Sequence, residues 1–281
     1  MAGHYSPTPD ESHTLEKGDI VKIELGAHID GYLANAAHTV VIGGEATGRN
    51  ADTVLAAWNA FQAALRTFRV GGTNQEVTQV IQRVCEQYEV EPLQGVLSHK
   101  VKKHLNDGNE TIINKETPEQ RVDDYEFAPG DVFSFDVYVS SGEGIARELD
   151  VRTTVYKREL EQMYNLKSKH ARAFFNQVNQ TYPTLPFSIS GFENLSGARV
   201  GVKECMEHDL LIDYPVLGEK PGEVIARFGA TVVVAAKAIQ VIAGKRQFNV
   251  EGINSEHQIK DQELNDIISR NLWVREKKAK K

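Results

Sequence analysis

The stretch VKIELGAHIDGYLANAAHT, residues 21–39, holds two β-prone runs on either side of the dipeptide Asp30-Gly31. Asp-Gly between two such runs is a strong signal for a β-hairpin with a two-residue type I′ turn. With that turn, Ile29 lies opposite Tyr32, and the pairing of the two strands is fixed along its whole length. The sequence therefore predicts a long hairpin.

The polar residues of this hairpin fall on one face. Glu24 is predicted to lie opposite Ala37, with Asn35 diagonal to Glu24 at about 7–8 Å between Cα atoms. Two carboxylates in this arrangement could flank a pair of metal ions, but here one of the two is an amide. The spacing alone favours the plainer interpretation, in which this is the solvated polar face of an edge hairpin.

Outward from the hairpin, helices and strands alternate along the chain. Apolar residues at helical spacing over 54–68 predict a helix ending at Gly71-Gly72, and Thr73-x-x-Glu76 is a capping box for the next helix. Clean alternation over 131–139 and the β-rich run 227–235 predict two strands. We expect one α+β domain, 1–281, with an inserted helical module at about 157–221 and a basic tail at about 275–281.

The composition limits the functions that are open to the chain. It has 281 residues, a net charge of −7 and two cysteines, which disfavours a disulfide framework or a cysteine-rich zinc site. The sequence shows no apolar run long enough to span a bilayer and no secretory signal, so we predict a cytosolic or nuclear location. Nucleic-acid binding by such an acidic chain needs a local basic patch.

Several sequence words resemble, in their order, the type II methionine aminopeptidases. They are GHYSP (3–7), the hairpin stretch 21–39, LSHKVKKHLNDG (97–108), VFSFDVYVSSGEG (132–144), RTTVYKR (152–158) and RFGATVVV (227–234). The words SSGEG, RTTVYKR and KHARAFF (169–175) are more similar still to the proliferation-associated proteins. These are also called curved-DNA-binding or ErbB-receptor-binding proteins, and they are the non-peptidase relatives on the same fold.

The resemblance implies the pita-bread fold. Family members carry a helix-rich segment before the GHYSP word, and Met1 stands just ahead of His4 here. We therefore expect this N-terminal helical segment to be missing. Its absence would leave apolar sheet surface uncovered, which predicts marginal stability or self-association.

The resemblance also implies which residues stand at the metal site of the peptidases, which hold two metal ions with four carboxylates and one histidine. A substrate-contacting histidine is matched by His4, and a second one, expected near residues 106–107, is absent. The metal-ligand positions are occupied by Glu24, Asn35, His99, Asp136 and Gly229.

Charge decides how this set is interpreted. Glu24 and Asp136 supply −2 against the +4 of two divalent ions, and Gly229 cannot supply the bridging carboxylate. We therefore predict a pseudoenzyme with no catalytic residue, no metal and no cofactor. Two alternatives stay open: a single ion held by Glu24, His99 and Asp136, and a residual metal-dependent methionine aminopeptidase.

Two basic clusters are the positive clue to function, because each cation that neutralises a phosphate contributes to binding. The resemblance implies a non-catalytic factor that binds ribosomes or structured RNA and is linked to growth, ribosome biogenesis or transcription control. DNA and protein partners, and a location in the cytoplasm and the nucleus or nucleolus, are further expectations. The predicted nucleic-acid-binding residues are Lys167, Lys169, Arg172, Arg275, Lys277, Lys278, Lys280 and Lys281.

Overall fold

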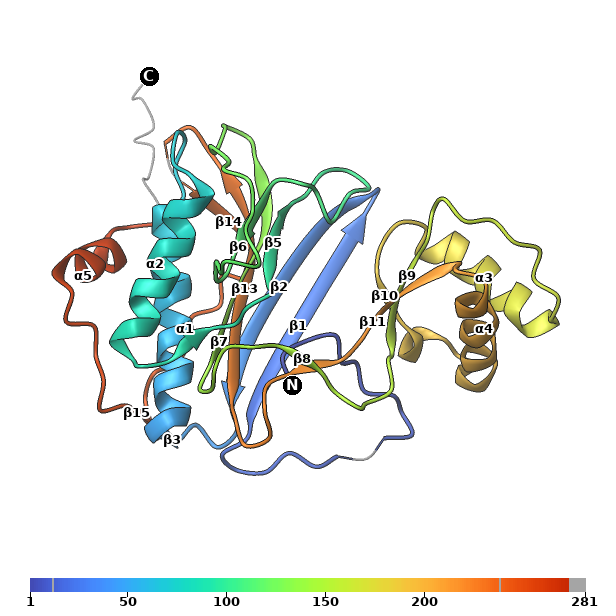
Figure 1. The fold of residues 1–281 in the computed structure, drawn as a ribbon, viewed down its shortest axis with the longest axis horizontal. Helices are drawn as coiled ribbons and strands as arrows, with labels where there is room; N and C mark the ends of the chain where they lie inside the picture. The colour runs from blue at the N-terminus through green and yellow to red at the C-terminus, as the bar shows by residue number, and fades with distance from the viewer. Residues whose placement is uncertain (12, 238, 273–281) are drawn as a thin grey trace, which may run out of the picture. The chain divides into compact units, whose positions relative to one another are not determined.

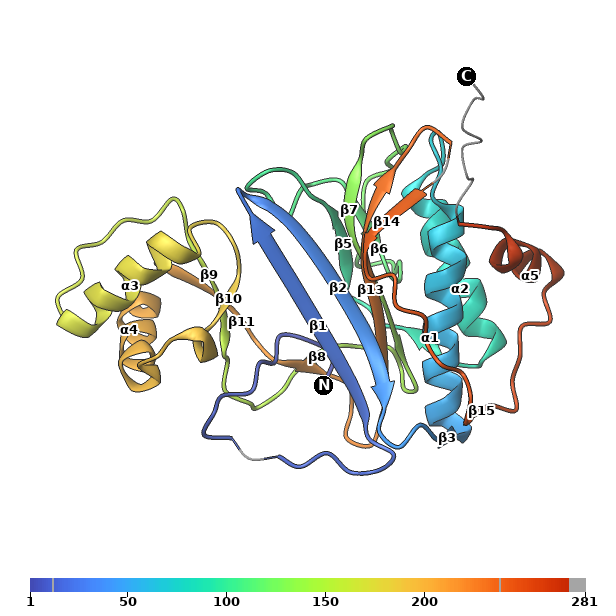
Figure 2. The same cartoon turned by 180° about the vertical axis from the view of Figure 1, so that it is seen from behind.

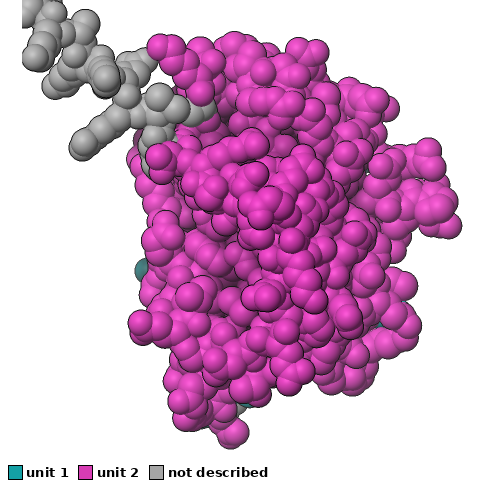
Figure 3. All heavy atoms as spheres, turned by 90° about the vertical axis from the view of Figure 1, so that its left-hand side faces the viewer, with its two compact units in different colours: residues 1–14, 147–218 teal, residues 15–146, 219–281 magenta. Residues whose placement is uncertain are grey.

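The computed structural model describes residues 1–11, 13–237 and 239–272. The chain divides into two compact units, coloured separately in Figure 3. The smaller unit combines residues 1–14 with 147–218, and the larger one combines 15–146 with 219–281.

The predicted hairpin is present in the larger unit. Strand β1, Ile20–Ile29, pairs antiparallel with β2, Tyr32–Val41, over their full length. Asp30 and Gly31 have φ angles of 51° and 85°, and positive φ at both central residues is what a type I′ turn requires. The predicted pairings of Ile29 with Tyr32 and of Glu24 with Ala37 are confirmed.

This hairpin forms one edge of an antiparallel sheet whose strands differ in length. Its main path runs in the order β1-β2-β13-β7-β5-β6, while β14 pairs with β13 and β4 pairs with β7. Strand β7 is the one that the alternating run predicts, and β13 is the one that the β-rich run predicts. The bounds are β13 Ile225–Val234, β7 Val132–Ser140, β5 Leu97–Lys100, β6 Thr111–Ile113, β14 Ile239–Ala243 and β4 Glu91–Pro92.

Helices α1, Gly48–Thr67, and α2, Asn74–Gln87, cover one face of this sheet, and α5, Gln262–Ser269, packs beside α1 (Figures 1 and 2). A short parallel pair, β3 Ala46–Thr47 with β15 Ile253–Asn254, lies where α1 begins. The core between helices and sheet is aromatic: Phe133 and Phe135 of β7 are fully buried, and Phe61 of α1 stacks on Phe135.

The prediction that the first helix ends at Gly71-Gly72 is wrong. Helix α1 ends at Thr67, because Phe68 already has an extended backbone with φ −61° and ψ 123°. Phe68 is buried against Phe127, so its apolar side chain continues the helical pattern after the helix has stopped. Gly71, with φ 77°, lies in the turn that follows.

The second helix begins as the capping signal predicts. The Thr73 hydroxyl accepts a hydrogen bond from the backbone N–H of Glu76 at 3.3 Å. The Glu76 carboxylate is bound by the Arg69 guanidinium at 2.8 Å, so it serves an ion pair across the turn. The N-terminus of α2 is thus fixed by one side-chain cap together with that ion pair.

The smaller unit has its own core. Strand β9, Val155–Arg158, lies between β10, Phe187–Ser188, and β11, Leu211–Tyr214. Helices α3, Lys169–Thr181, and α4, Leu195–Glu207, pack tightly, because a Cβ added at Gly201 would lie 2.5 Å from that of Phe174. The remaining elements are β8 Arg147–Glu148, β12 Leu217–Gly218 and the short 3-10 helix η1 Ile189–Gly191.

Most of the segment 157–221 belongs to this smaller unit, together with residues 1–14 and 147–156. Its interpretation as an inserted module stays a prediction. The basic tail 275–281 lies outside the described residues. Within the part of the chain that the structure describes, no helix has the length and apolarity needed to span a membrane.

Candidate functional site

Four residues of the larger unit form a row across neighbouring strands. Glu24 of β1 is opposite Ala37 of β2, Ala37 is opposite Gly229 of β13, and Gly229 is opposite Asp136 of β7. Paired residues of antiparallel strands point to the same face. The two outer residues are acidic and the two inner ones have little or no side chain, so the row leaves space between two carboxylates.

The side chain of Arg227 fills this space. Arg227 precedes Gly229 by two residues on β13 and therefore points to the same face. Its Nη1 and Nη2 donate to the two Glu24 carboxylate oxygens at 2.6 and 3.0 Å. Its Nε donates to Asp136 Oδ1 at 2.8 Å. A guanidinium can bind one carboxylate with two nitrogens while a third reaches another, and the site uses that geometry.

The arginine is buried although it is charged. Its side chain is 8% exposed, against 15% for Asp136 and 52% for Glu24. The Tyr138 ring lies beneath the guanidinium, 4.7 Å from Cζ to the ring centroid. Burial alone would lower the pKa of Arg227, but the Asp136 and Glu24 carboxylates outweigh burial and hold that pKa well above its ordinary value.

A side chain does not fit at Gly229 in this arrangement. A Cβ built at Gly229 would lie 2.1 Å from Asp136 Oδ1 and 3.1 Å from the Ala37 Cβ. The Asp136 carboxylate thus occupies the space into which a longer side chain would point. Any larger residue at position 229 would displace Asp136 or break its hydrogen bond with Arg227.

The other two predicted ligand positions have partners of their own. The His99 ring lies opposite Ser134 of β7, and its Nδ1 donates to the Gly108 carbonyl at 3.0 Å. The Asn35 amide donates to the Ser134 hydroxyl at 3.3 Å. The structure brings Glu24, Asp136 and Arg227 together and leaves His99 and Asn35 in separate hydrogen bonds.

The substrate-contact positions are also used locally. His4 belongs to the smaller unit, where its Nδ1 lies 3.1 Å from the Pro215 carbonyl oxygen. Near residues 106–107 the chain does have a histidine, His104. Its backbone N–H donates to the Gly31 carbonyl at 2.8 Å, and its ring packs on the tip of the hairpin.

The side chains at this site do not fit a pair of metal ions. The two carboxylates carry −2, the guanidinium adds +1, and the remaining −1 is far from balancing +4. The guanidinium fixed between the carboxylates already binds three of their four oxygen atoms. Among the residues described by the structure, no group of three or more His, Cys, Asp and Glu side chains could hold a metal ion.

Arg227 is one of two residues on this face that the sequence pattern does not identify. In the sequence it is only the first residue of the word RFGATVVV. Arg227 and Gly229 are two residues apart on one strand, so both point to the same face of the sheet. This spacing could have shown that a cation lies on the same face as the two acids. Lys22 was missed as well: it shares a face with Glu24, donates to the Ile225 carbonyl at 3.0 Å, and burial lowers its pKa to about 8.

The predicted basic cluster at the start of α3 is only partly available. Lys167 and Lys169 are exposed. The Arg172 Nη1 donates to the carbonyls of Leu166 and Lys167 at 3.1 and 2.6 Å, so this arginine also holds the chain before the helix. The other predicted nucleic-acid-binding residues, 275–281, lie outside the described residues.

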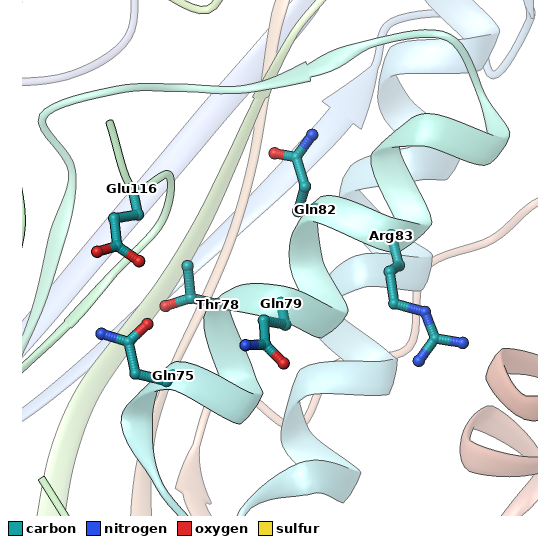
Figure 4. A pocket seen from close by; sticks show the side chains of 6 residues that line it. All are labelled: Gln75, Thr78, Gln79, Gln82, Arg83 and Glu116. Atoms are coloured by element: carbon teal, nitrogen blue, oxygen red, sulfur yellow. The ribbon is translucent and has the colours of Figure 1, made fainter. Parts of the chain in front are cut away.

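A polar pocket of about 390 Å³ lies along the outer face of α2 (Figure 4). Its only positive lining residue, Arg83, is bound by Asp261 and Glu263 at 2.6 and 2.9 Å. With its cation already paired, the pocket offers hydrogen-bonding groups but no set of groups suited to catalysis. The lining residues are Gln75, Thr78, Gln79, Gln82, Arg83 and Glu116.

Comparison with known proteins agrees with this fold. Metallopeptidase family M24 matches residues 2–155. "Proliferation-associated protein A" of Dictyostelium discoideum is 40% identical over 99% of this chain and 73% of its own length. "ERBB-3 BINDING PROTEIN 1" of Solanum tuberosum is 42% identical, but the chain spans only 60% of that relative. The "Curved DNA-binding protein" of Schizosaccharomyces pombe is 33% identical over 75% of its length.

The chain therefore belongs to metallopeptidase family M24. Within this family the chain is more similar to the proliferation-associated proteins than to the methionine aminopeptidases, which confirms the resemblance seen in the sequence. The methionine aminopeptidase of Thermococcus onnurineus is more distant, at 26% identity over 83% of this chain and 77% of its own.

Solved structures confirm the pita-bread fold. A thermophilic Arx1 superposes with a TM-score of 0.84 at 24% identity, covering 95% of this chain and 79% of its own. A methionine aminopeptidase from Thermotoga maritima gives a TM-score of 0.51 at 16% identity, covering 81% and 64%. At such identities the likeness concerns the fold alone.

Proposed function

We propose that this chain is a non-catalytic factor that binds ribosomes or structured RNA and takes part in growth, ribosome biogenesis or transcription control. The observation that carries the non-catalytic part is the Arg227 guanidinium between Glu24 and Asp136. An arginine neutralises carboxylates but does not provide the open coordination position that activates water. The names of the more similar relatives, which are not peptidase names, support the same conclusion.

The RNA-binding part of the proposal is electrostatic. Exposed Lys167 and Lys169 at the start of α3, and the cations of 275–281, are local basic groups on a chain of net charge −7. Contacts of this kind are expected to be largely independent of RNA sequence and steeply dependent on salt. One relative is named for binding ErbB-3 and another for binding curved DNA, so protein and DNA partners belong to the proposal, as does a cytoplasmic and nuclear or nucleolar location.

Co-sedimentation with ribosomes at two salt concentrations tests the proposal. We expect the unmodified chain to pellet with ribosomes at low salt and to be released at high salt. The double variant Lys167→Ala, Lys169→Ala should bind more weakly, with a slope of log affinity against log salt flatter by about 0.7 per lost phosphate contact on single strands. Removal of residues 277–281 should have a milder effect, because ordering a tail costs entropy.

Two further variants complete the test. Lys260→Ala removes an exposed lysine elsewhere and should leave co-sedimentation nearly unchanged. Glu24→Gln alters the polar sheet face and should not matter if the basic groups make the contact. The proposal fails if the chain does not bind ribosomes or RNA at low salt. If Glu24→Gln abolishes binding and the lysine variants keep it, the sheet face is the contact instead.

A further inference from the structure

A small basic pocket lies in the larger unit, away from the arginine–carboxylate site. It forms where the end of α1, the start of β14 and the residues after α5 meet, and its volume is about 170 Å³. Leu65, Phe68 and Leu272 contribute apolar side chains to it. Its rim carries the cations Arg66, Arg69, Lys237 and Arg270.

These four cations differ in how far they are already neutralised. Arg69 is fully paired, because both of its terminal nitrogens contact Glu76 at 2.8 Å. Arg66 donates to the Gln62 backbone and side-chain oxygens at 2.8 and 2.9 Å and to the Arg270 carbonyl at 2.7 Å, all of them neutral acceptors. Since Arg66 lies in the last turn of α1, the negative end of the helix offsets part of its charge.

Lys237 and Arg270 are the cations left over. Both are exposed, and neither forms an ion pair with another residue that the structure describes. They converge from parts of the chain that are more than 30 residues apart, on a protein whose net charge is −7. Cations that line one pocket of an acidic protein, with no ion-pair partner among the described residues, form a local electrostatic footprint for an anionic ligand.

We propose that this pocket binds the phosphate backbone of single-stranded RNA, with Lys237 and Arg270 as the direct contacts and Arg66 as the cation that positions the Arg270 backbone. This inference rests on the proposed RNA-binding function and adds a site to it. Arginine and lysine are the usual phosphate-binding side chains, and the arginine fork can hold two phosphate oxygens. The pocket is also followed in the sequence by five cations and one acid within 275–281, a pattern suited to a ligand with repeated negative charges.

The test is binding of a labelled single-stranded oligouridylate to the full chain across a salt series. The double variant Lys237→Ala, Arg270→Ala should bind about tenfold more weakly at low salt, and its log–log salt slope should be flatter by about 1.4, which corresponds to two phosphate contacts. The matched control is Arg246→Ala, Lys260→Ala, which removes one arginine and one lysine, both exposed, from the same unit. If both double variants lose the same amount of affinity for oligouridylate, binding depends only on net charge and the proposed site is wrong.

Lysine footprinting tests the proposed site independently of the net charge of the protein. Acetylation of Lys237 in the unmodified chain should slow in the presence of oligouridylate, while acetylation of Lys260 should not. If the chain binds the oligonucleotide but Lys237 is not protected, this site is wrong and the proposed function stands. If the chain binds neither oligouridylate nor ribosomes, the proposed function itself fails. If polyglutamate protects Lys237 and displaces the RNA at equal charge concentration, the pocket is an acidic-peptide site and the RNA assignment is overturned.

Discussion

At the scale of single residues, Arg227 is the cation that binds the acidic side chains on this face of the sheet. Its guanidinium contacts both Glu24 and Asp136 and is covered by the Tyr138 ring. A cation attached to the chain cannot dissociate, so one of the two negative charges stays balanced without any metal. We therefore expect Glu24, Asp136 and Arg227 to act structurally, so that a substitution at Arg227 changes the stability of the fold.

Arg227→Met should destabilise the fold by about 3 kcal/mol, because removing one partner leaves Asp136 as an uncompensated, mostly buried charge. The loss attributable to Glu24 should be small, since that side chain is half exposed. Urea unfolding measures the effect. Arg227→Lys keeps the charge but loses the two-nitrogen contact, so it should fall between the methionine variant and the unmodified chain. A methionine variant as stable as the unmodified chain would contradict this role.

Lys22 should make stability depend on alkaline pH. Its pKa falls from 10.5 to about 8 because burial disfavours the charged form. The unfolded chain therefore binds more protons than the folded one between these values, and stability should rise as the pH increases through that window. Below pH 8 the full cost applies, which is at most about 3 kcal/mol for this shift.

Lys22→Met should remove that cost and raise stability at neutral pH. Unfolding free energies measured from pH 7 to 10 should converge for the variant and the unmodified chain as the pH rises. Taking the difference of the two curves removes the opposite contribution of tyrosines such as Tyr138, whose pKa burial raises. Lys260→Met, at an exposed position, is the control. Parallel curves for Lys22→Met would show that Lys22 keeps an ordinary pKa.

At the scale of elements, strand β1 is the exposed edge of the sheet. From Ile23 to Ile29 every residue is exposed, and Leu25 and Ile29 retain 68% and 74% of their accessible surface. Lys22, Glu24 and His28 alternate with the apolar residues, so the edge is amphipathic along its length. A long, apolar edge strand with unpaired backbone groups is a template for association.

Leu25→Lys should therefore reduce self-association. The charge opposes a second strand approaching β1, while the fold should survive because Leu25 lies outside the buried core. Sedimentation velocity over a concentration series measures the effect. Val200→Lys is the control, because Val200 is also an exposed apolar residue, 51% exposed, but lies on α4 and not on the edge strand. This variant should leave self-association unchanged. A chain that stays monomeric at every concentration would refute this expectation.

At the scale of the whole molecule, the sheet of the larger unit has the framework of family M24 and carries the arginine–carboxylate site on one face. The family match and the superposition with a methionine aminopeptidase concern the framework. The row Glu24, Ala37, Gly229 and Asp136 concerns the chemistry. Because the framework depends on apolar spacing and the chemistry on a few polar positions, one can persist when the other changes.

Added cobalt, manganese or iron should produce no release of methionine from a Met-Ala-Ser peptide. The two carboxylates and the guanidinium leave a net −1, and position 229 provides no bridging carboxylate, so no activated water should form between two metals. The assay compares the unmodified chain with Glu24→Ala under each metal. Metal-dependent turnover above that variant would refute the pseudoenzyme prediction and support the residual aminopeptidase.

Features that depend on neighbouring residues can be predicted from the sequence alone. Asp30-Gly31 fixes the turn and hence the pairing of Glu24 with Ala37, and Thr73 fixes the start of α2. The alternation in β7 predicts which side chains are buried, since Phe133 and Phe135 are fully inside. Turn chemistry, caps and periodicity act over a few residues, so a local pattern is enough to predict them.

Only the tertiary structure decided which distant side chains meet. Arg227 follows Glu24 by 203 residues and Asp136 by 91 in the sequence. The alternation of residues along a strand shows which face each side chain points to, but it does not show the order of the strands in the sheet. The end of α1 was also decided by packing, because Phe68 reaches the core from an extended backbone. The basic pocket needs residues 66, 237 and 270 in one place. Such contacts depend on strand order and helix packing, which the whole core sets and no short stretch of sequence contains.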